Sequence, residues 1–464
     1  MRRLSLFLLP PIAALLGGCD SLIRAALVPT HYASHQLCSA VFVGGLDPEE
    51  FYRDGIEREI APVGGLIGRH VDRDKAEVTS NFLGLVSSRS VYRGALGCQV
   101  VHGERPLDTP VDIGPASPSL LPEIAGPSLV EPPDGALKAA IDRAFVETKS
   151  GPQRRTKAIV VVHDGRVIGE RYASGYGVDT PLIGWSMTKS VINALLGILV
   201  REGKLKVDEP APVAAWSDLE DPRHAITIDN LLRMNSGIAF GQSLQSDWTS
   251  AFDPSAQMEF DVPDMAAMAE KARLADPPGT KWNYSNGNTL LLSRIIRDKV
   301  GGDAVSVLRF AHRELFDKLG LQHATLEFDG SGTPIGSSHM WATARDWARF
   351  GMLYLDDGVV GGQRILPAGW VDYSARLTPG SEDYGYGAGF WTNRGSSPMI
   401  RMRVRAGMPP DSLMARGSQG QIAIIVPSAR LVIVRLGMAY TPYGDIEAIE
   451  RLVRDTIAAL PQSS

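Results

Sequence analysis

A serine and a lysine three residues apart stand where a helix is expected to begin, in the segment 185–190, Trp-Ser-Met-Thr-Lys-Ser. Residues with this spacing share one face of a helix, so the Lys189 amine is expected to face the Ser186 hydroxyl. A serine hydroxyl is a poor nucleophile until a base takes its proton, and a lysine serves when burial or a neighbouring cation lowers its pKa. The pattern therefore predicts nucleophilic catalysis by Ser186 with Lys189 as the base.

A tyrosine and an asparagine, Tyr284 and Asn286, follow a Pro/Gly-rich lead-in and precede a helical pattern over 289–300. A phenol beside an amine shares or relays a proton, so Tyr284 and Lys189 are expected to titrate as a coupled pair. The Asn286 amide both donates and accepts hydrogen bonds, which suits it to hold a substrate amide or the lysine. The alternative interpretation is a turn with a packed tyrosine.

A glycine-rich segment, Arg416-Gly417-Ser418-Gln419-Gly420-Gln421, opens an apolar strand over 421–426. Glycine at a strand edge lets a substrate approach the backbone closely. The N–H of Ser418 is expected to pair with that of Ser186 as an oxyanion hole, which stabilises the charge that develops in acyl transfer. The alternative is an ordinary turn at the end of a strand.

The three motifs together, S-x-x-K, Y-x-N and a glycine-rich strand, resemble those of the serine β-lactamase-related superfamily. The tyrosine version is similar to class C β-lactamases, family VIII carboxylesterases and 6-aminohexanoate-dimer hydrolases, and segments 226–237 and 340–350 add to the likeness. The resemblance covers about 134–464. It implies a serine hydrolase that cleaves a small-molecule ester or amide through an acyl-enzyme on Ser186, without a cofactor or a metal.

One departure from that family pattern concerns the third motif. β-Lactamases carry a lysine where this chain has Ala415, and Arg416 is the next residue. Because successive strand residues face opposite sides, the expectation is that Arg416 points away from the site. This favours an esterase or amidase over an efficient β-lactamase. The alternative function is a penicillin-recognising binding or sensor protein that is acylated without efficient turnover.

Two further groups of residues near the third motif each admit two interpretations. Arg401, Arg403 and Arg405 alternate and are expected to share one face of a strand, as a solvated surface rather than an anion site. A preceding aromatic segment suits a strand core somewhat better than a pocket lining. Its aromatic residues are Tyr384, Tyr386, Phe390 and Trp391.

The expected elements indicate an α+β fold. Both ends of the C-terminal region carry a hairpin and a helix, with helical patterns between them, so we expect one antiparallel sheet built from both chain ends and a helical subdomain beside it. Asp164-Gly165 marks the first hairpin turn. The expected elements are helices over 136–148, 187–201 and 445–460 and strands over 158–162, 166–172, 421–426 and 431–436.

The N-terminus predicts export. Two arginines precede an apolar run over 4–16, which is shorter than the roughly 20 residues that span a bilayer. Its end, Leu16-Gly-Gly-Cys19, resembles the bacterial lipoprotein box. Residues 1–18 are therefore expected to be a signal peptide and Cys19 a lipidated residue that anchors the protein to a membrane. Asp20, by resemblance to lipoprotein sorting, favours the periplasmic side of a Gram-negative inner membrane.

The remaining chain is expected to form a small N-terminal domain (19–105), a proline-rich linker (106–133) and the serine hydrolase domain (134–464), with residues 20–37 as a tether. Cys38 and Cys98 are expected to form a disulfide, since the chain has three cysteines and an exported protein folds in an oxidising compartment. The nine histidines are scattered and predict no metal site. A net charge of −5 argues against a nucleic-acid partner.

Overall fold

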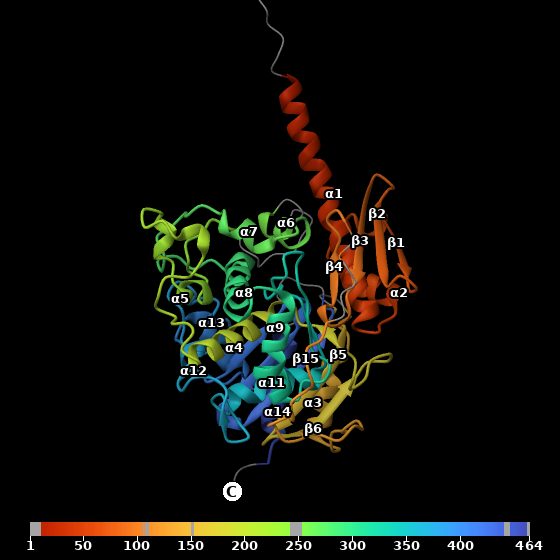
Figure 1. Ribbon diagram of the computed structural model, residues 1–464. Helices are drawn as coiled ribbons and strands as arrows, with labels where there is room; N and C mark the ends of the chain where they lie inside the picture. The colour runs from red at the N-terminus through yellow and green to blue at the C-terminus, as the bar shows by residue number, and fades with distance from the viewer. Residues whose placement is uncertain are drawn as a thin grey trace, which may run out of the picture.

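The computed structural model describes residues 11–104, 106, 111–149, 153–241, 253–439 and 446–461, and for 11–22 and 24 it describes the backbone alone. Its centre is an antiparallel sheet of six strands in the order β12-β13-β14-β15-β5-β6 (Figure 1). The strands are β5 (Thr156–His163), β6 (Arg166–Tyr172), β12 (Trp391–Thr392), β13 (Leu413–Arg416), β14 (Ile422–Val426) and β15 (Leu431–Gly437). Both chain ends contribute to the sheet, because β15 pairs with β5, so the expected α+β architecture is confirmed.

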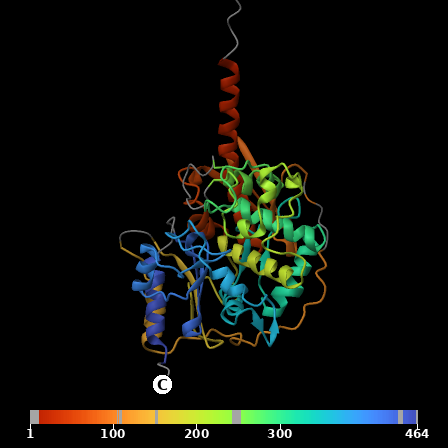
Figure 2. The same ribbon diagram turned by 90° about the vertical axis from the view of Figure 1, so that its left-hand side faces the viewer.

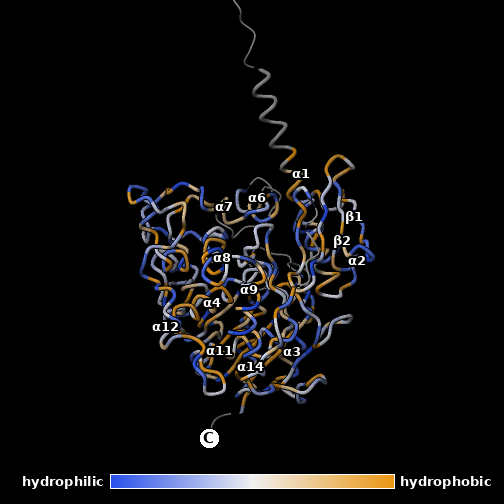
Figure 3. Tube along the Cα trace, viewed as in Figure 1, coloured by the Kyte–Doolittle hydropathy of each residue, from blue (hydrophilic) through white to orange (hydrophobic). Residues whose placement is uncertain are grey.

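Helices cover both faces of this sheet. On one face α3 (Ala136–Ala144) and α14 (Ile446–Ala459) place Ile141 and Leu452 against alternate strand residues such as Ile159 and Ile433. These helices lie together beside the sheet in Figure 2. On the other face lie α11 (Ala344–Leu355) and α4 (Thr188–Arg201). The tube of α4 is mostly orange in Figure 3, because most of its residues are hydrophobic. Burial of both faces explains why the expected strands are almost uniformly apolar.

The segment between β6 and β12 contains the helical subdomain and two small sheets. Its helix α8 (Asn286–Val300) is buried beside α4 and carries the residues that follow Tyr284. The three-stranded sheet has the order β7-β9-β8 and leads into the Ser186 turn. Its strands are β7 (Leu182–Ile183), β8 (Thr325–Leu326) and β9 (Met340–Ala342), and a second hairpin pairs β10 (Val359–Val360) with β11 (Gln363–Arg364). The other helices are α5 (Ile228–Leu232), α6 (Pro254–Phe260), α7 (Met265–Glu270), α9 (Ala304–Ala311), α10 (Asp317–Leu319), α12 (Trp370–Ala375) and α13 (Pro398–Ala406).

The N-terminal region (residues 28–104) is a four-stranded meander packed on one long helix. The helix α1 (Pro11–Phe42) rises from the body in Figure 1, and its side chains are largely buried from Val28 onward. The expectation that 20–37 form a tether is therefore wrong from about residue 28. The remaining elements are α2 (Pro48–Phe51), β1 (Ile67–Asp72), β2 (Glu77–Phe82), β3 (Val86–Tyr92) and β4 (Cys98–Val100).

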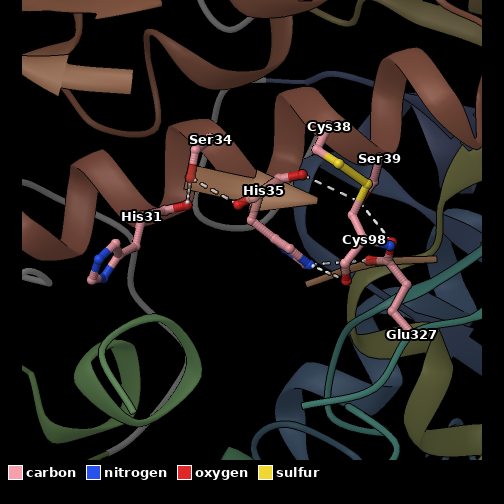
Figure 4. The surroundings of a disulfide bond; sticks show 8 residues. His31, Ser34, His35, Cys38, Ser39, Cys98 and Glu327 are labelled. Carbon is pink, nitrogen blue, oxygen red and sulfur yellow. Dashed lines mark hydrogen bonds and ion pairs between the residues drawn. A yellow bond between two sulfur atoms is a disulfide. The ribbon is translucent and has the colours of Figure 1, made fainter. Parts of the chain in front are cut away.

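A disulfide joins α1 to β4, between Cys38 and Cys98 (Figure 4), so this expectation is confirmed. The Cys19 side chain and residues 1–10 of the expected signal peptide lie outside the described residues. Among the residues that the structure describes, no helix combines the length and hydrophobicity needed to cross a membrane.

The proline-rich segment packs along the C-terminal region. Residues 111–133 contain no helix or strand, but Leu121 and Ile124 are buried. The Arg345 guanidinium donates to the Gly126 carbonyl at 2.7 Å, and the Glu170 N–H donates to the Val130 carbonyl at 2.9 Å. The segment is thus a strap rather than a free connection.

The three arginines at 401, 403 and 405 lie on a helix, so the expected strand there is wrong. Ser397 caps the N-terminus of α13 and Pro398 occupies its first turn, which are helix-start signals. Gly407 ends it with a φ of 108°. Arg403 is buried, and its guanidinium donates to the Tyr384 carbonyl at 3.0 Å.

Candidate active site

Ser186 lies in a sharp turn between β7 and α4. Trp185, directly before it, has a φ of 49°, which is a left-handed conformation that a bulky residue adopts only when its surroundings impose it. Gly184 permits the close approach of Trp347, because a Cβ at this position would lie 2.3 Å from the indole ring. The hydroxyl of Ser186 is thereby presented at the start of α4, as the sequence predicts.

Lys189 is buried one helical turn beyond Ser186. Its Nζ lies 3.1 Å from Ser186 Oγ, 2.7 Å from Asn286 Oδ1 and 2.7 Å from the Ser337 carbonyl oxygen. Two of these three neighbours are pure acceptors, and a neutral amine has two N–H groups to give them. The remaining lone pair then points at Ser186 Oγ and is placed to accept its proton.

Burial also favours the neutral form of Lys189. Desolvation disfavours the charged amine and lowers the pKa of Lys189 to about 7, against a smaller opposing effect of the Glu259 carboxylate. An amine with this pKa is substantially unprotonated at neutral pH, which is what a general base requires. The geometry and the electrostatics thus agree on the form of Lys189.

Tyr284 is a second side chain in contact with the Ser186 hydroxyl. Burial raises the pKa of Tyr284, whereas a hydrogen bond with Ser186 and the charge of Arg416 oppose that rise. Lys189 Nζ lies 4.9 Å from the centre of the Tyr284 ring. Tyr284 is therefore a protonated phenol at neutral pH, in contact with the nucleophile and ready to donate.

The aromatic segment before the third motif packs around Tyr284. The Tyr386 and Trp391 rings lie 5.5 and 5.4 Å from the Tyr284 ring, and both side chains are buried. Tyr384 is 39% exposed, and its ring lies tilted against that of Trp282 with 4.9 Å between centres. Tyr386, Phe390 and Trp391 are core residues, as the core interpretation expects, and Tyr386 and Trp391 also pack against Tyr284.

Gly417, directly after β13, brings the end of this strand against the nucleophile. A Cβ on Gly417 would lie 2.2 Å from the Gly184 carbonyl oxygen and 3.0 Å from the Ser186 backbone nitrogen, so only glycine fits. Ser418 follows and is exposed. The backbone N–H groups of Ser186 and Ser418 are thus on neighbouring segments, as an oxyanion hole requires.

Arg416 lies on the same side as Tyr284, so the expectation that it points away is wrong. Tyr284 packs with Trp391 and Met414 on one face of the sheet, whereas Ala415 belongs to the core on the opposite face. The face that carries Met414 is also the face of Arg416. Its guanidinium lies 5.1 Å from the centre of the Trp391 ring, and burial lowers its pKa to about 10. A cation therefore stands near Tyr284 although residue 415 is alanine.

Sequence reasoning missed Glu259, a buried carboxylate behind Lys189. It accepts hydrogen bonds from the Ser337 and Ser338 hydroxyls, the second at 2.8 Å, and from Asn286. Burial raises the pKa of Glu259, while these bonds and Lys189 oppose the rise. A lone glutamate on the short helix α6 has no local signal, because only the tertiary fold brings it to Lys189.

One buried cluster has the side-chain types of a metal site: His35, Glu327 and His339 offer ligand atoms within 4.8 Å of one another. The His35 Nε2 bonds the Cys98 carbonyl at 2.9 Å. The two ring nitrogens of His339 bond Gln36 at 2.9 Å and Ser338 at 2.7 Å. Because these nitrogens already have protein partners, the cluster fits a hydrogen-bonded network better than a metal site.

Comparisons with known proteins agree with the fold. A 6-aminohexanoate-dimer hydrolase from Paenarthrobacter ureafaciens is 26% identical over 300 residues, which are 61% of this chain and 72% of the relative. A penicillin-binding protein homologue from Caulobacter crescentus has a TM-score of 0.53 at 18% identity, over 71% of this chain and 99% of the other. A family VIII carboxylesterase has a TM-score of 0.52 at 15% identity, over 70% and 97%.

The match to a protein-family model is the strongest of these findings. The Beta-lactamase model matches residues 141–456, which include every residue of the site in the C-terminal region. The N-terminal region and the strap lie outside the match. The chain belongs to the Beta-lactamase family, within the serine β-lactamase-related superfamily.

Proposed function

We propose that the chain hydrolyses an ester or amide bond through a covalent acyl-enzyme on Ser186. Membership of the family supports serine-hydrolase activity in general. The observation that carries the finer proposal is the set of partners of Lys189, which uses both N–H groups of a neutral amine on Asn286 and Ser337 and leaves its lone pair for Ser186.

The reaction proceeds in two halves. Ser186 Oγ attacks the substrate carbonyl carbon while its proton passes to Lys189, and the N–H groups of Ser186 and Ser418 bind the oxyanion. Tyr284 donates its proton to the leaving amine or alkoxide as the carbonyl–heteroatom bond breaks, and the Lys189 proton restores the phenol. Water then attacks the acyl-enzyme and gives a proton to Lys189 or Tyr284. That proton returns to Ser186 Oγ as the acid product leaves.

The substrate class is a linear ester or amide. This rests partly on the relative named for the 6-aminohexanoate dimer, which is a linear amide, and on the absence of lysine at position 415. Arg416 supplies a cation near Tyr284, so slow β-lactam hydrolysis is compatible with the site. A second candidate function is a penicillin-recognising binder that is acylated and stalls, since deacylation depends on a placed water.

The test is a panel of nitrophenyl esters of graded acyl length, short linear amides and a chromogenic cephalosporin, with fluorophosphonate labelling as a count of active sites. Turnover of an ester or amide that is lost in Ser186→Ala, together with the label, supports the proposal. Persistent labelling of Ser186→Ala contradicts the choice of nucleophile. A stoichiometric burst without turnover marks the binder.

We also propose that the protein is anchored to a membrane through lipidated Cys19, on the periplasmic side of a Gram-negative inner membrane. The lipoprotein-like segment 16–19 supports this, and Asp20 supports the choice of membrane. Several acyl chains bury enough methylenes, at about 0.8 kcal/mol each, for stable attachment. Wild-type protein should sediment with membranes through a salt wash and incorporate labelled palmitate, and Cys19→Ser should not. A soluble wild-type protein whose mature N-terminus lies elsewhere contradicts the anchor.

A further inference from the structure

The N-terminal region touches the surroundings of the nucleophile although it lies outside the family match. The Tyr32 ring on α1 is stacked on Trp185, with 6.1 Å between centres and 4° between planes. Trp185 is the residue held in a left-handed conformation directly before Ser186. Helix α1 therefore supports the turn that presents the hydroxyl.

A second contact reaches the third motif. The Gln419 side-chain amide donates to the Gly55 carbonyl at 2.8 Å and lies 3.2 Å from the Glu59 carboxylate. Gln419 directly follows Ser418 and has a φ of 58°. The N-terminal region thus also supports the backbone next to the oxyanion hole.

A third contact enters the hydrogen-bond network behind Lys189. Gln36 on α1 is fully buried, and its Nε2 lies 2.9 Å from His339 Nε2. His339 Nδ1 lies 2.7 Å from Ser338 Oγ, and Ser338 Oγ lies 2.8 Å from the Glu259 carboxylate. His339 and Ser338 thus link Gln36 of the N-terminal helix to the Glu259 carboxylate beside Lys189.

The direction of these bonds is determined from the carboxylate end. Glu259 accepts, so Ser338 must donate to it and accept from His339 Nδ1–H. His339 Nε2 then carries no proton and needs a donor, which the Gln36 amide supplies. The Gln36 amide therefore stabilises the tautomer of His339 that the carboxylate end of the network requires.

The network continues from Glu259 to the base. Glu259 bonds Asn286, which leaves the Asn286 carbonyl oxygen to accept from Lys189 at 2.7 Å. Ser337, which also donates to Glu259, provides the second acceptor of Lys189 through its backbone carbonyl. Both acceptors that direct the Lys189 lone pair toward Ser186 are thus held through Glu259.

We propose that Gln36 is a positioning residue of the active site, and that through His339, Ser338 and Glu259 it keeps Lys189 aimed at Ser186. The N-terminal region is then part of the catalytic apparatus rather than an appended module. This inference rests on the proposed function, because it takes Lys189 as the base that activates Ser186.

The groups that determine the charge state of Lys189 come from several elements. Glu259 on α6 favours its charged form, and His339, before β9, lies near enough to feel its charge. Burial, His35 and Lys189 together hold the pKa of His339 well below its usual value, which favours its neutral form. Tyr284 faces Lys189 with its ring, and Arg416 acts on Tyr284.

The experiment measures the second-order rate of fluorophosphonate labelling of Ser186 between about pH 5 and 9, normalised to the final number of labelled sites. This readout needs no natural substrate and ignores misfolded molecules. Gln36→Leu removes the donor, whereas Gln36→Glu replaces it with an acceptor and reverses the polarity of the network. Ser338→Ala cuts the network from inside the C-terminal region. Ser34→Ala is the matched control, since Ser34 is equally buried on α1 but bonds Ser88 and Ser90 within the N-terminal region.

The expected result is a loss of about tenfold in labelling rate per site for Gln36→Leu and Ser338→Ala, as for one lost buried hydrogen bond, with a displaced acidic limb of the pH profile. Gln36→Glu should be slower than Gln36→Leu, and Ser34→Ala should match wild type. If Gln36→Leu, Gln36→Glu and Ser338→Ala all keep the wild-type pH profile and the wild-type labelling rate per site, the inference is overturned, even where their melting temperatures fall. Labelling that survives in Ser186→Ala overturns the proposed function instead, so the two failures are distinguishable.

Discussion

The catalytic pair of the C-terminal region and the N-terminal helix α1 behind it differ in how their buried polar groups are satisfied. In the C-terminal region, which carries the family match, Lys189 has three close partners and Glu259 several donors. On α1, His35 Nδ1 and Gln36 Oε1 are buried without a hydrogen-bond partner. An unsatisfied buried atom costs stability, so these two groups on α1 are held in place at some cost to the folded state.

The two parts of the molecule therefore contribute differently to the site: one sets the protonation states of its catalytic residues, and the other helps to hold these residues in position. The charged groups that act directly on the pKa values of Lys189 and Tyr284 belong to the C-terminal region, whereas Tyr32 and Gln36 of the N-terminal region act on the site only through the residues that they contact. We therefore expect very large effects on the chemistry from variants in the first set, and graded effects on rate and stability from variants in the second.

The largest effect is expected for the base and its phenol partner. Lys189→Ala and Tyr284→Phe should each lower kcat/KM by about 100-fold or more, because each removes a proton acceptor or donor from the transition state. The double variant should be little slower than the poorer single variant, since residues that act as a unit are not additive. Steady-state kinetics on the best ester measure this, and strictly additive losses would show that the two residues act separately.

The disulfide should matter chiefly for stability. It closes a loop with a sequence separation of 60, and its removal in Cys38→Ala/Cys98→Ala should cost about 2–4 kcal/mol of unfolding free energy. Denaturant unfolding measures that loss. The activity per labelled site should fall less than in Lys189→Ala. An equal fall would show that the N-terminal region contributes as much to catalysis as the base does.

The pH dependence should track Lys189. Because only the unprotonated amine accepts the Ser186 proton and its pKa is about 7, kcat/KM should fall about tenfold per unit as the pH drops below 7. Glu259→Gln removes the charge that favours the protonated amine, so the acidic limb should move to lower pH. A limb that stays in place in this variant would argue that another group titrates there.

The smallest effect on activity concerns Glu327, a buried carboxylate between the regions that accepts hydrogen bonds from Ser39 and the Cys98 N–H. Burial raises the pKa of Glu327 to about 8, from an ordinary value of 4.5. The folded state therefore binds the proton more tightly than the unfolded state, and this stabilisation is lost as the pH rises from 4.5 to 8. Glu327→Gln should gain stability relative to wild type across this window, by about 1 kcal/mol or more. A difference that is independent of pH would contradict the assignment.

Some features could be predicted from the sequence because they depend on neighbours along the chain. The Ser186–Lys189 spacing fixes both side chains on one helix face, and Asp164 and Gly165 adopt the positive φ angles, 46° and 81°, of a tight hairpin. The expected strands of the central sheet and the helices at both ends of the C-terminal region are also confirmed, because the pattern of apolar residues that predicts them is local.

Other features depended on which segments the fold brings together, and only the tertiary structure decided them. Glu259 reaches Lys189 across the core, and Arg416 faces Tyr284 because Tyr284 packs on the face opposite Ala415. The arginines of α13 alternate along the sequence, but a serine cap and a C-terminal glycine make the segment a helix. Gln36 falls within the expected polar tether, yet burial against the C-terminal region makes its amide the hydrogen-bond donor of His339. Hydrophobic periodicity predicts helices and strands, but it says nothing about which polar side chains will meet. The roles of these polar residues therefore depend on the partners that the tertiary fold gives them.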